Sequence, residues 1–299
     1  MSVRVTQSMV ASRQLADVQR ATSQLADATR TASTQKRITQ ASDDPTGTAR
    51  ALGMRDALQA MDGHEAAASA AGGMLDAADT ALQGMSDVLG RVRELTVRAA
   101  SAGTDASGRA SIATELQGLT STLKDLANAS YDGRYVLAGA ASGTRPYDPA
   151  GGDAYAGDAG VVAQQVGPGT SVVANPVTGG ALLGSGAGDG KLLDVLRTIA
   201  AHVGAGDVAS LGSSDLRALS GADDALGAAV AAVGAGQQRT SAAQARIGDS
   251  RTATTKALKG VEDADLASSL VALTSQQSAY QAALKATGSL LSKSLMDFL

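Results

Sequence analysis

Apolar side chains near the end of the chain recur in steps of three and four, and this register limits the possible folds more than any other feature of the sequence. Its large members between residues 266 and 298 are Leu266, Leu270, Leu273, Tyr280, Leu284, Leu291 and Phe298. A heptad register of this kind predicts a helix whose apolar seam is covered by a second helix. Gln277, Thr287 and Gly288 interrupt the seam, so we expect the helix to be marginal without a partner.

A weaker register of the same kind follows the start of the chain. Its members are Leu15, Val18, Thr22, Leu25, Thr29 and Ala32. Two weak seams at opposite ends of one chain predict partners for each other, because each offers apolar surface that the other needs. We therefore expect two paired helical arms. We also expect Leu15, Val18 and Leu25, together with the seven large side chains named above, to form an assembly interface.

Three further stretches show helical periodicity, at about residues 54–95, 112–126 and 216–261. The last of these registers slips between Val261 and Leu266, where five residues stand in place of three or four. A slip in a heptad pattern indicates a bend or a break. The sequence therefore predicts long helices in the middle of the chain and a joint before the final helix.

Two short segments are expected to join these helices to the terminal arms. In the first, Asp44 can cap a helix and Pro45 can occupy its first turn, where the missing N–H of proline costs no hydrogen bond. In the second, several acids precede a helix, and capping or helix-dipole roles explain them better than a cation site does. The predicted joint residues are Asp43, Asp44, Pro45, Glu262, Asp263 and Asp265.

Residues 131–190 differ in composition from the helical stretches on either side. They hold fifteen of the thirty-five glycines and four of the five prolines, and the short alternating runs between them predict strands and turns. We therefore expect a mainly α fold, with a long antiparallel helical bundle or coiled-coil rod formed by both chain ends and a small β-rich outer insert at 131–190. The expected terminal arms are 1–43 and 262–299, and the expected helical core is 44–130 with 191–261.

Composition favours functions that need no reactive site. The chain has no cysteine, which excludes disulfides, thiolate metal sites and cysteine nucleophiles. Its two histidines, His64 and His202, show no metal-ligand or catalytic spacing, and no set of nucleophile, base and oxyanion donors can be assembled. One Phe and no Trp suit thin helix pairs better than an enzyme core. We expect no enzyme activity, no cofactor and no metal.

Charge and hydropathy argue against nucleic-acid and membrane partners. The net charge is -4, and although both ends are mildly basic, neither carries a basic face studded with aromatic side chains. The sequence contains no run of eighteen apolar residues, and its first fifteen residues lack the apolar segment of a signal peptide. We expect no nucleic-acid binding, no membrane span and no cleaved signal, so export would use another route.

The nested plan of the chain resembles the flagellin superfamily of bacterial flagella, and three motifs carry the resemblance. "QKRITQASDDPTGTARA" is similar to the segment that follows the first helix in that family, although Gln35 stands where glycine is common. "GRVRELTVRAASAGTDASGRASIATELQGL" resembles the long core helix, turn and return helix, and "VEDADLASSL" resembles the entry into the C-terminal helix. Within the superfamily, "NASYDGRYVLAGAASGTRPY" and "SLMDFL" resemble hook-filament junction proteins more than flagellin.

The resemblance implies a structural subunit that is exported unfolded by the flagellar type III apparatus and acts by self-assembly. It implies an extracellular place at the hook-filament junction, with copies of the chain in a ring. The implied partners are hook-associated protein 1 on the hook side, flagellin on the filament side, and a cytosolic export chaperone. Two alternatives stay open: a flagellin filament subunit, and a secreted adhesin or signalling ligand carried by the central domain.

The resemblance also implies a possible contact with a host. By motif position, Arg91, Leu95 and Glu115 match the surface of flagellin that a vertebrate innate immune receptor binds. The alternative is an ordinary charged helix face with Leu95 in the core.

Overall fold

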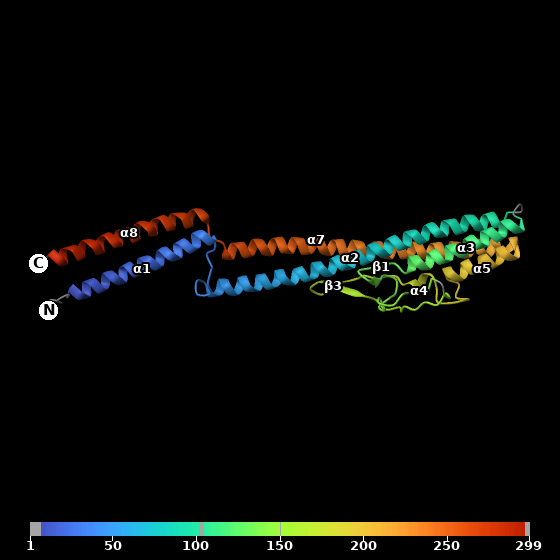
Figure 1. Ribbon diagram of the computed structural model, residues 1–299, viewed down its shortest axis with the longest axis horizontal. Coiled ribbons are helices and arrows are strands. Elements are labelled where there is room, and N and C mark those ends of the chain that lie inside the picture. The colour runs from blue at the N-terminus through green and yellow to red at the C-terminus, as the bar shows by residue number, and fades with distance from the viewer. Residues whose placement is uncertain (1–6, 102–104, 150, 297–299) are drawn as a thin grey trace. The chain divides into compact units, whose positions relative to one another are not determined.

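Figure 1 shows the computed structural model of the protein, which describes residues 7–101, 105–149 and 151–296. The chain divides into two compact units. Unit 1 consists of residues 1–59 and 251–299, and unit 2 consists of residues 60–250. Two long helices, α2 (Pro45–Ala99) and α7 (Leu216–Glu262), each contribute to both units.

Unit 1 is built around α1 (Gln7–Thr34) and α8 (Leu266–Met296), which lie side by side and antiparallel (Figure 1). The first turns of α2 and the last turns of α7 complete the unit. The predicted pairing of the two terminal helices is therefore confirmed. The predicted break is also present, because α7 ends at Glu262 and α8 begins at Leu266.

The helices of unit 2 form an antiparallel bundle. Its members besides α2 and α7 are α3 (Ala106–Ala127) and α5 (Leu192–Ala205). Asp76 on α2 accepts a hydrogen bond of 2.8 Å from Gln237 on α7, and Arg93 lies 3.6 Å from Asp223. Because later positions of α2 meet earlier positions of α7, the two helices run in opposite directions.

The core of unit 2 is formed mainly by Leu, Val, Ala and Met side chains on the facing sides of its helices. Its fully buried leucines are Leu75, Leu82, Leu95, Leu116, Leu123, Leu137, Leu183, Leu193, Leu196, Leu211 and Leu219. One contiguous cluster joins residues of α2, α3, α5 and α7. The mainly helical fold predicted from the 3.6-residue periodicity is confirmed.

The insert between α3 and α5 contains short strands, as expected, but most of its backbone is irregular. β1 (Ser130–Tyr131) pairs with β2 (Arg134–Tyr135), and β3 (Ala163–Gly167) pairs with β4 (Thr170–Val173), both antiparallel. The β1–β2 turn has positive φ at Asp132 and Gly133, as the type I′ turn of a two-residue hairpin requires. A single-turn helix, α4 (Gly179–Leu182), follows β4.

The apolar side chains of the insert belong to the same core as the helices. Leu137, Tyr147 and Leu183 are fully buried in the cluster that contains the leucines of α2 and α3. The β1–β2 hairpin also rests on α2, since a Cβ on Gly73 would lie 2.2 Å from the ring of Tyr131. Folding of the insert and of the bundle is therefore coupled through shared burial.

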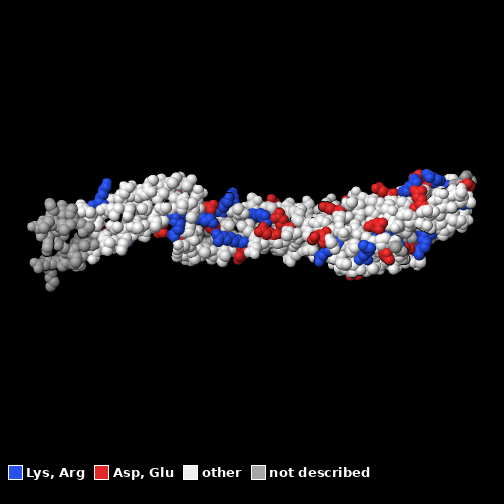
Figure 2. All heavy atoms as spheres, in the orientation of Figure 1, with Lys and Arg blue, Asp and Glu red and all other residues white. Residues whose placement is uncertain are grey.

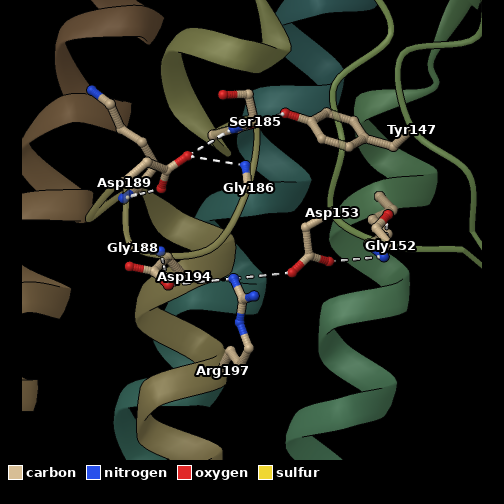
Figure 3. A network of polar contacts seen from close by, with 12 residues as sticks. Tyr147, Gly152, Asp153, Ser185, Gly186, Gly188, Asp189, Asp194 and Arg197 are labelled. Carbon is tan, nitrogen blue, oxygen red and sulfur yellow. Dashed lines mark hydrogen bonds and ion pairs between the residues drawn. The ribbon is translucent and has the colours of Figure 1, made fainter.

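Polar contacts fasten the insert to α3 and α5. The buried ammonium of Lys124 on α3 donates to the carbonyl oxygens of Gly151 and Gly152 at 3.0 and 3.2 Å and lies 3.0 Å from the Asp153 carboxylate. Arg197 on α5 pairs with the other oxygen of Asp153 at 3.1 Å (Figure 3). One carboxylate thus connects two helices through the insert.

A loop before α5 folds around two further carboxylates. Asp189 accepts hydrogen bonds from the backbone N–H groups of Ser185 and Gly186, and Asp194 accepts from those of Gly188 and Gly190 (Figure 3). Carboxylates that accept backbone hydrogen bonds in this way fix the shape of a loop. The stretch "GSGAGDGKLL" is therefore an ordered turn that leads into a helix.

Between α5 and α7 the chain makes two short helical pieces that the sequence analysis did not separate. These are α6 (Val208–Ser210) and a single π-helical turn, η1 (Leu211–Asp215). Asp215 is buried, and its carboxylate lies 2.7 Å from Nδ1 of His202 at the end of α5. The pairing satisfies a carboxylate that would be costly to bury alone.

Candidate assembly interface

The contact between α1 and α8 covers one stripe on each helix. On α8 the half-buried positions are Leu273, Gln276, Tyr280, Ala283 and Thr287, and on α1 they include Gln14, Val18, Ala21, Leu25 and Ala28. Both stripes follow steps of three and four, as two helices packed along one seam require. Of the predicted interface residues, Val18, Leu25, Leu273 and Tyr280 therefore serve the contact inside the chain.

Other predicted interface residues lie outside that stripe and are exposed. Leu266, Leu270 and Leu284 expose 47%, 48% and 45% of their surface, and Leu15 on α1 exposes 60%. Leu270 follows Leu266 by four residues and Leu284 follows Leu270 by fourteen, about four helical turns, so the three side chains lie along one side of α8 beside the covered stripe. We call these three residues the second seam of α8.

Helix α8 presents a surface with very little charge. Only Lys285 and Lys293 are charged among the residues of Leu266–Met296. On the face drawn in Figure 2, the described part of the α1–α8 pair carries few charged side chains. A long exposed surface that combines leucines with few charges is typical of a protein-protein contact.

A shallow groove lies on a different side of α8 from the second seam. Its lining residues are Ala267, Ser268, Val271, Ala272, Ser275 and Gln276. Val271 is the most exposed large apolar side chain of the described chain, at 69%. Exposed apolar surface thus extends around α8 beyond its contact with α1.

Two predicted interface residues cannot be placed with the others. Leu291 lies within α8, but its side chain is outside the described part of the structure. Phe298 lies outside the described residues altogether. Their role at an interface stays a prediction.

The first joint is a loop between α1 and α2 that is held by two aspartates. Asp43 accepts hydrogen bonds from the backbone N–H groups of Thr39 and Gln40, both at 2.9 Å. Asp44 accepts from the N–H of Gly47 at 2.9 Å, which caps the start of α2. These hydrogen bonds favour the ionised form, so the pKa of each carboxyl is lowered from its ordinary value, chiefly by Thr39 and by Gly47 respectively.

Proline occupies the first residue of α2. Pro45 is predicted at this place because its missing N–H costs no hydrogen bond in the first turn of a helix. The structure starts α2 at Pro45.

The second joint crosses from α7 to α8 over three residues. Asp265 accepts hydrogen bonds from the hydroxyl and the backbone N–H of Ser268, at 2.7 and 3.1 Å, and so caps the start of α8. The hydroxyl of Ser268 is the main cause of the lowered pKa of Asp265. Asp263 forms an isolated antiparallel bridge with Lys36 of the first joint through its backbone.

Glu262 differs from the other joint acids because it is buried. Its carboxylate pairs with Lys36 at 3.1 Å and with Arg55 at 2.6 Å. Its backbone oxygen accepts a hydrogen bond of 2.7 Å from the N–H of Arg37. Glu262 is among the predicted joint residues, but its three partners were not predicted, because the periodicity of a helix carries no signal for an ion pair between residues so far apart in the sequence.

Gln35 has a left-handed backbone conformation that residues other than glycine rarely adopt. Its φ is 55°, and its N–H donates to the carbonyl oxygen of Thr31 at 2.9 Å, which ends α1. Glycine adopts this left-handed conformation without steric cost, which explains physically why glycine suits this position. Gln35 therefore carries a side chain at a position where the left-handed backbone favours glycine.

The residues of the predicted host contact are only partly accessible. Arg91 is half-buried and Glu115 is exposed; the two pair with each other at 2.7 Å, and Arg91 also pairs with Glu94 at 2.7 Å. The hydrogen bonds to Glu94 and then Glu115 raise the pKa of Arg91 above its ordinary value. Leu95 is fully buried in the core of unit 2, so it offers no surface to a receptor in this conformation.

Within the described residues, no helix is long and apolar enough to cross a membrane. No group of three or more His, Cys, Asp or Glu side chains is arranged to hold a metal ion in the part of the chain that the structure describes.

Comparison with known families agrees with this geometry. Residues 5–142 match the N-terminal helical region of bacterial flagellin. The predicted resemblance to the flagellin superfamily is confirmed.

The chain is similar in particular to flagellar hook-associated protein 3. The protein of that name from Salmonella typhimurium is 31% identical over 133 residues, which cover 44% of this chain and 42% of the relative. The protein of the same name from Escherichia coli is 31% identical over 142 residues, covering 47% of this chain and 44% of the relative. Each match thus spans less than half the length of the relative.

A solved structure shares the fold over a larger part of the chain. Flagellar hook-associated protein 3 from Legionella pneumophila superposes with a TM-score of 0.59 and covers 70% of this chain and 98% of that one. The identity is 16%, so this likeness concerns the fold alone.

Proposed function

We propose that this protein is a structural subunit at the junction between the hook and the filament of the bacterial flagellum, and that it acts by self-assembly rather than by chemistry. The observation that carries the proposal is the second seam of α8, whose leucines the described part of the chain leaves about half exposed. Names of similar proteins support the flagellar setting. In that setting the protein is exported and stands outside the cell.

The second seam explains how one chain can serve as an adaptor. Val18, Leu25 and Tyr280 are used inside the chain, whereas Leu270 and Leu284 are free to contact copies of the chain in a ring. Apolar surface that gains a cover on assembly adds to the stability of the assembled state and not to that of the free chain. Hook-associated protein 1 and flagellin are the expected neighbours on either side, and an export chaperone is expected in the cytosol.

Flagellin is the second candidate, because its N-terminal region is the family that residues 5–142 match. Abundance separates the two roles. A filament subunit is the main protein of sheared filaments, whereas a junction subunit is present only as a short ring. An adhesin or ligand role for residues 131–190 has less support, since that segment shares the core of unit 2.

The proposal is tested by charge on the second seam. Leu284→Asp places a carboxylate where a neighbouring helix would lie, at a cost of several kcal/mol once that site is dry. We expect normal secretion and near-native melting of the free chain, because Leu284 is already half exposed, but no filament and flagellin shed into the medium. Lys285→Glu is the control, since it changes the adjacent charge by two units at a position that is already charged.

Two outcomes would count against the proposal. Filament growth in the Leu284→Asp strain would show that the second seam is not an assembly surface. Equal loss of assembly with Lys285→Glu would show that the effect comes from charge in general and not from the apolar seam.

A further inference from the structure

Both joints of unit 1 meet at the carboxylate of Glu262. The side chain of Glu262 is 5% exposed. Its Oε1 lies 2.6 Å from a guanidinium nitrogen of Arg55 on α2, and its Oε2 lies 3.1 Å from the ammonium of Lys36 in the first joint. One carboxylate at the end of α7 therefore binds two segments that lie far from it in sequence.

Backbone hydrogen bonds join the same segments. The N–H of Arg37 donates to the carbonyl oxygen of Glu262 at 2.7 Å, and its guanidinium donates to that of Val261 at 2.8 Å. In the opposite direction, the N–H of Ala264 donates to the carbonyl oxygen of Gln35 at 2.9 Å. The loop that ends α1 and the break that precedes α8 are thus a single hydrogen-bonded structure.

The burial of Glu262 makes this structure cooperative. A buried carboxylate is strongly unfavourable without its partners, whereas Lys36 and Arg55 are half exposed and can return to water. If either joint opened alone, Glu262 would lose part of its compensation while the other joint still kept it from water. The state with both joints closed is therefore the most stable one. Opening both joints together is expected to cost less free energy than opening each of them separately.

We propose that Glu262 with Lys36 and Arg55 forms a latch that couples the two joints, so that α1 and α8 become ordered or disordered as one element. For the function proposed above, the latch would present the surfaces of both arms to a neighbouring copy at the same time. The coupling itself is a property of the free chain and does not depend on that function.

Hydrogen exchange of the free chain tests the latch. Glu262→Gln keeps the shape of the side chain but removes the charge that binds Lys36 and Arg55. We expect protection of the Arg37 and Ala264 amides, and of both α1 and α8, to fall by about tenfold or more, which corresponds to one lost charge-assisted pair. Protection in the core of unit 2 should be unchanged.

Asp263→Asn is the matched control. It removes the same charge one residue along the chain, at an exposed side chain whose contact with Lys36 is made by the backbone. We expect native protection in both arms. Equal loss of protection in Asp263→Asn and Glu262→Gln would overturn the proposal, because the effect would then follow net charge and not the latch.

Variants of the cations provide a second, graded test. Lys36→Met and Arg55→Met each remove the partner of a different oxygen of Glu262. Both should lower protection at both joints. Loss confined to the first joint in Lys36→Met, or to α2 in Arg55→Met, would overturn the coupling. Loss that spreads to the core of unit 2 would also overturn it, because the latch is a local structure of unit 1.

Hook capping separates this proposal from the function on which it builds. If Glu262→Gln lowers the exchange protection of α1 and α8 together but filaments grow normally, the latch is supported and its role in assembly is removed. If protection falls in only one of the two helices and filaments are lost, the latch is overturned and the junction role is left intact.

Discussion

Unit 1 and unit 2 are built from helices with the same apolar periodicity, yet the apolar side chains of unit 2 are buried far more completely than those of unit 1. In unit 2, Leu82, Leu116 and Leu196 have no accessible surface, because each helix has several neighbours. In unit 1, Val18 and Leu25 are only half buried, because α1 has α8 as its main neighbour. The difference indicates that unit 2 is complete within one chain, whereas unit 1 retains surface that a partner can cover.

The largest expected effect is the difference in stability lost when one leucine of each unit is replaced by alanine. Leu82→Ala in unit 2 should lower the free energy of unfolding by about 2–5 kcal/mol, since the side chain is fully buried and leaves a cavity. Leu25→Ala in unit 1 should cost under about 1 kcal/mol, because water already reaches that site. Urea denaturation of the two variants measures both values. Similar losses would mean that unit 1 is as tightly packed as unit 2.

A second prediction concerns the insert, which the structure places in the core of unit 2. Lys124→Met removes a buried ammonium that serves two carbonyl oxygens and Asp153, and should destabilise unit 2 by about 1–3 kcal/mol. Arg197→Met is the control, because this guanidinium is 43% exposed and its pair should contribute about 0–1 kcal/mol. Cleavage of the insert by a protease, measured beside urea denaturation, should rise in Lys124→Met alone. If it does not, the insert is held by its apolar contacts.

A third, smaller effect would strengthen unit 1. Gln35→Gly should raise the stability of the α1 end by about 0.5 kcal/mol, because relief of the left-handed strain exceeds the added entropy of the unfolded chain. Gln35→Ala should give no gain, since alanine keeps the steric conflict. Thermal melting of α1, followed by hydrogen exchange, distinguishes the two variants. A gain with alanine would attribute the effect to the loss of the Gln side chain.

The smallest effect is expected from acid. The pKa values of Asp43 and Asp44 are lowered from 3.8 in the folded chain, so their contribution to stability is present above that value and is lost as pH falls through the lowered values. The first joint should therefore loosen in strong acid while the uncharged leucine core of unit 2 is affected less. An NMR titration of the Thr39 and Gly47 amides measures this. In Asp43→Asn, the acid response of the Thr39 amide should disappear.

Local signals in the sequence predicted much of unit 1 and less of unit 2. The start of α2 at Pro45 and the break before Leu266 followed from capping chemistry and from one slip in a heptad register. The insert was expected to lie outside the core because its glycines and prolines resemble those of surface loops. That inference missed Leu137 and Tyr147, whose burial depends on contacts with distant helices.

The residues of α8 that were predicted on one seam divide between two faces in the folded chain. Leu273 and Tyr280 lie on the face that α1 covers, whereas Leu270 and Leu284 are exposed beside it, because steps of three and four fit both faces. Which of two neighbouring faces meets α1 depends on the shape of both helices. The partners of Glu262 were missed for a similar reason, since no local pattern connects residues 36 and 262.

The pairing of the chain ends has a consequence for the order of folding. Lys36 and Glu262 are 226 positions apart, and closing a flexible loop of that length costs about 5 kcal/mol of chain entropy. Because α2 and α7 run antiparallel in unit 2, folding of that unit brings residues 60 and 250 to the same end of it, and most of this entropy is lost before the arms meet. We therefore expect α1 and α8 to pair last during folding and to separate first during unfolding. Any state in which unit 2 has unfolded should then also lack the contact between α1 and α8.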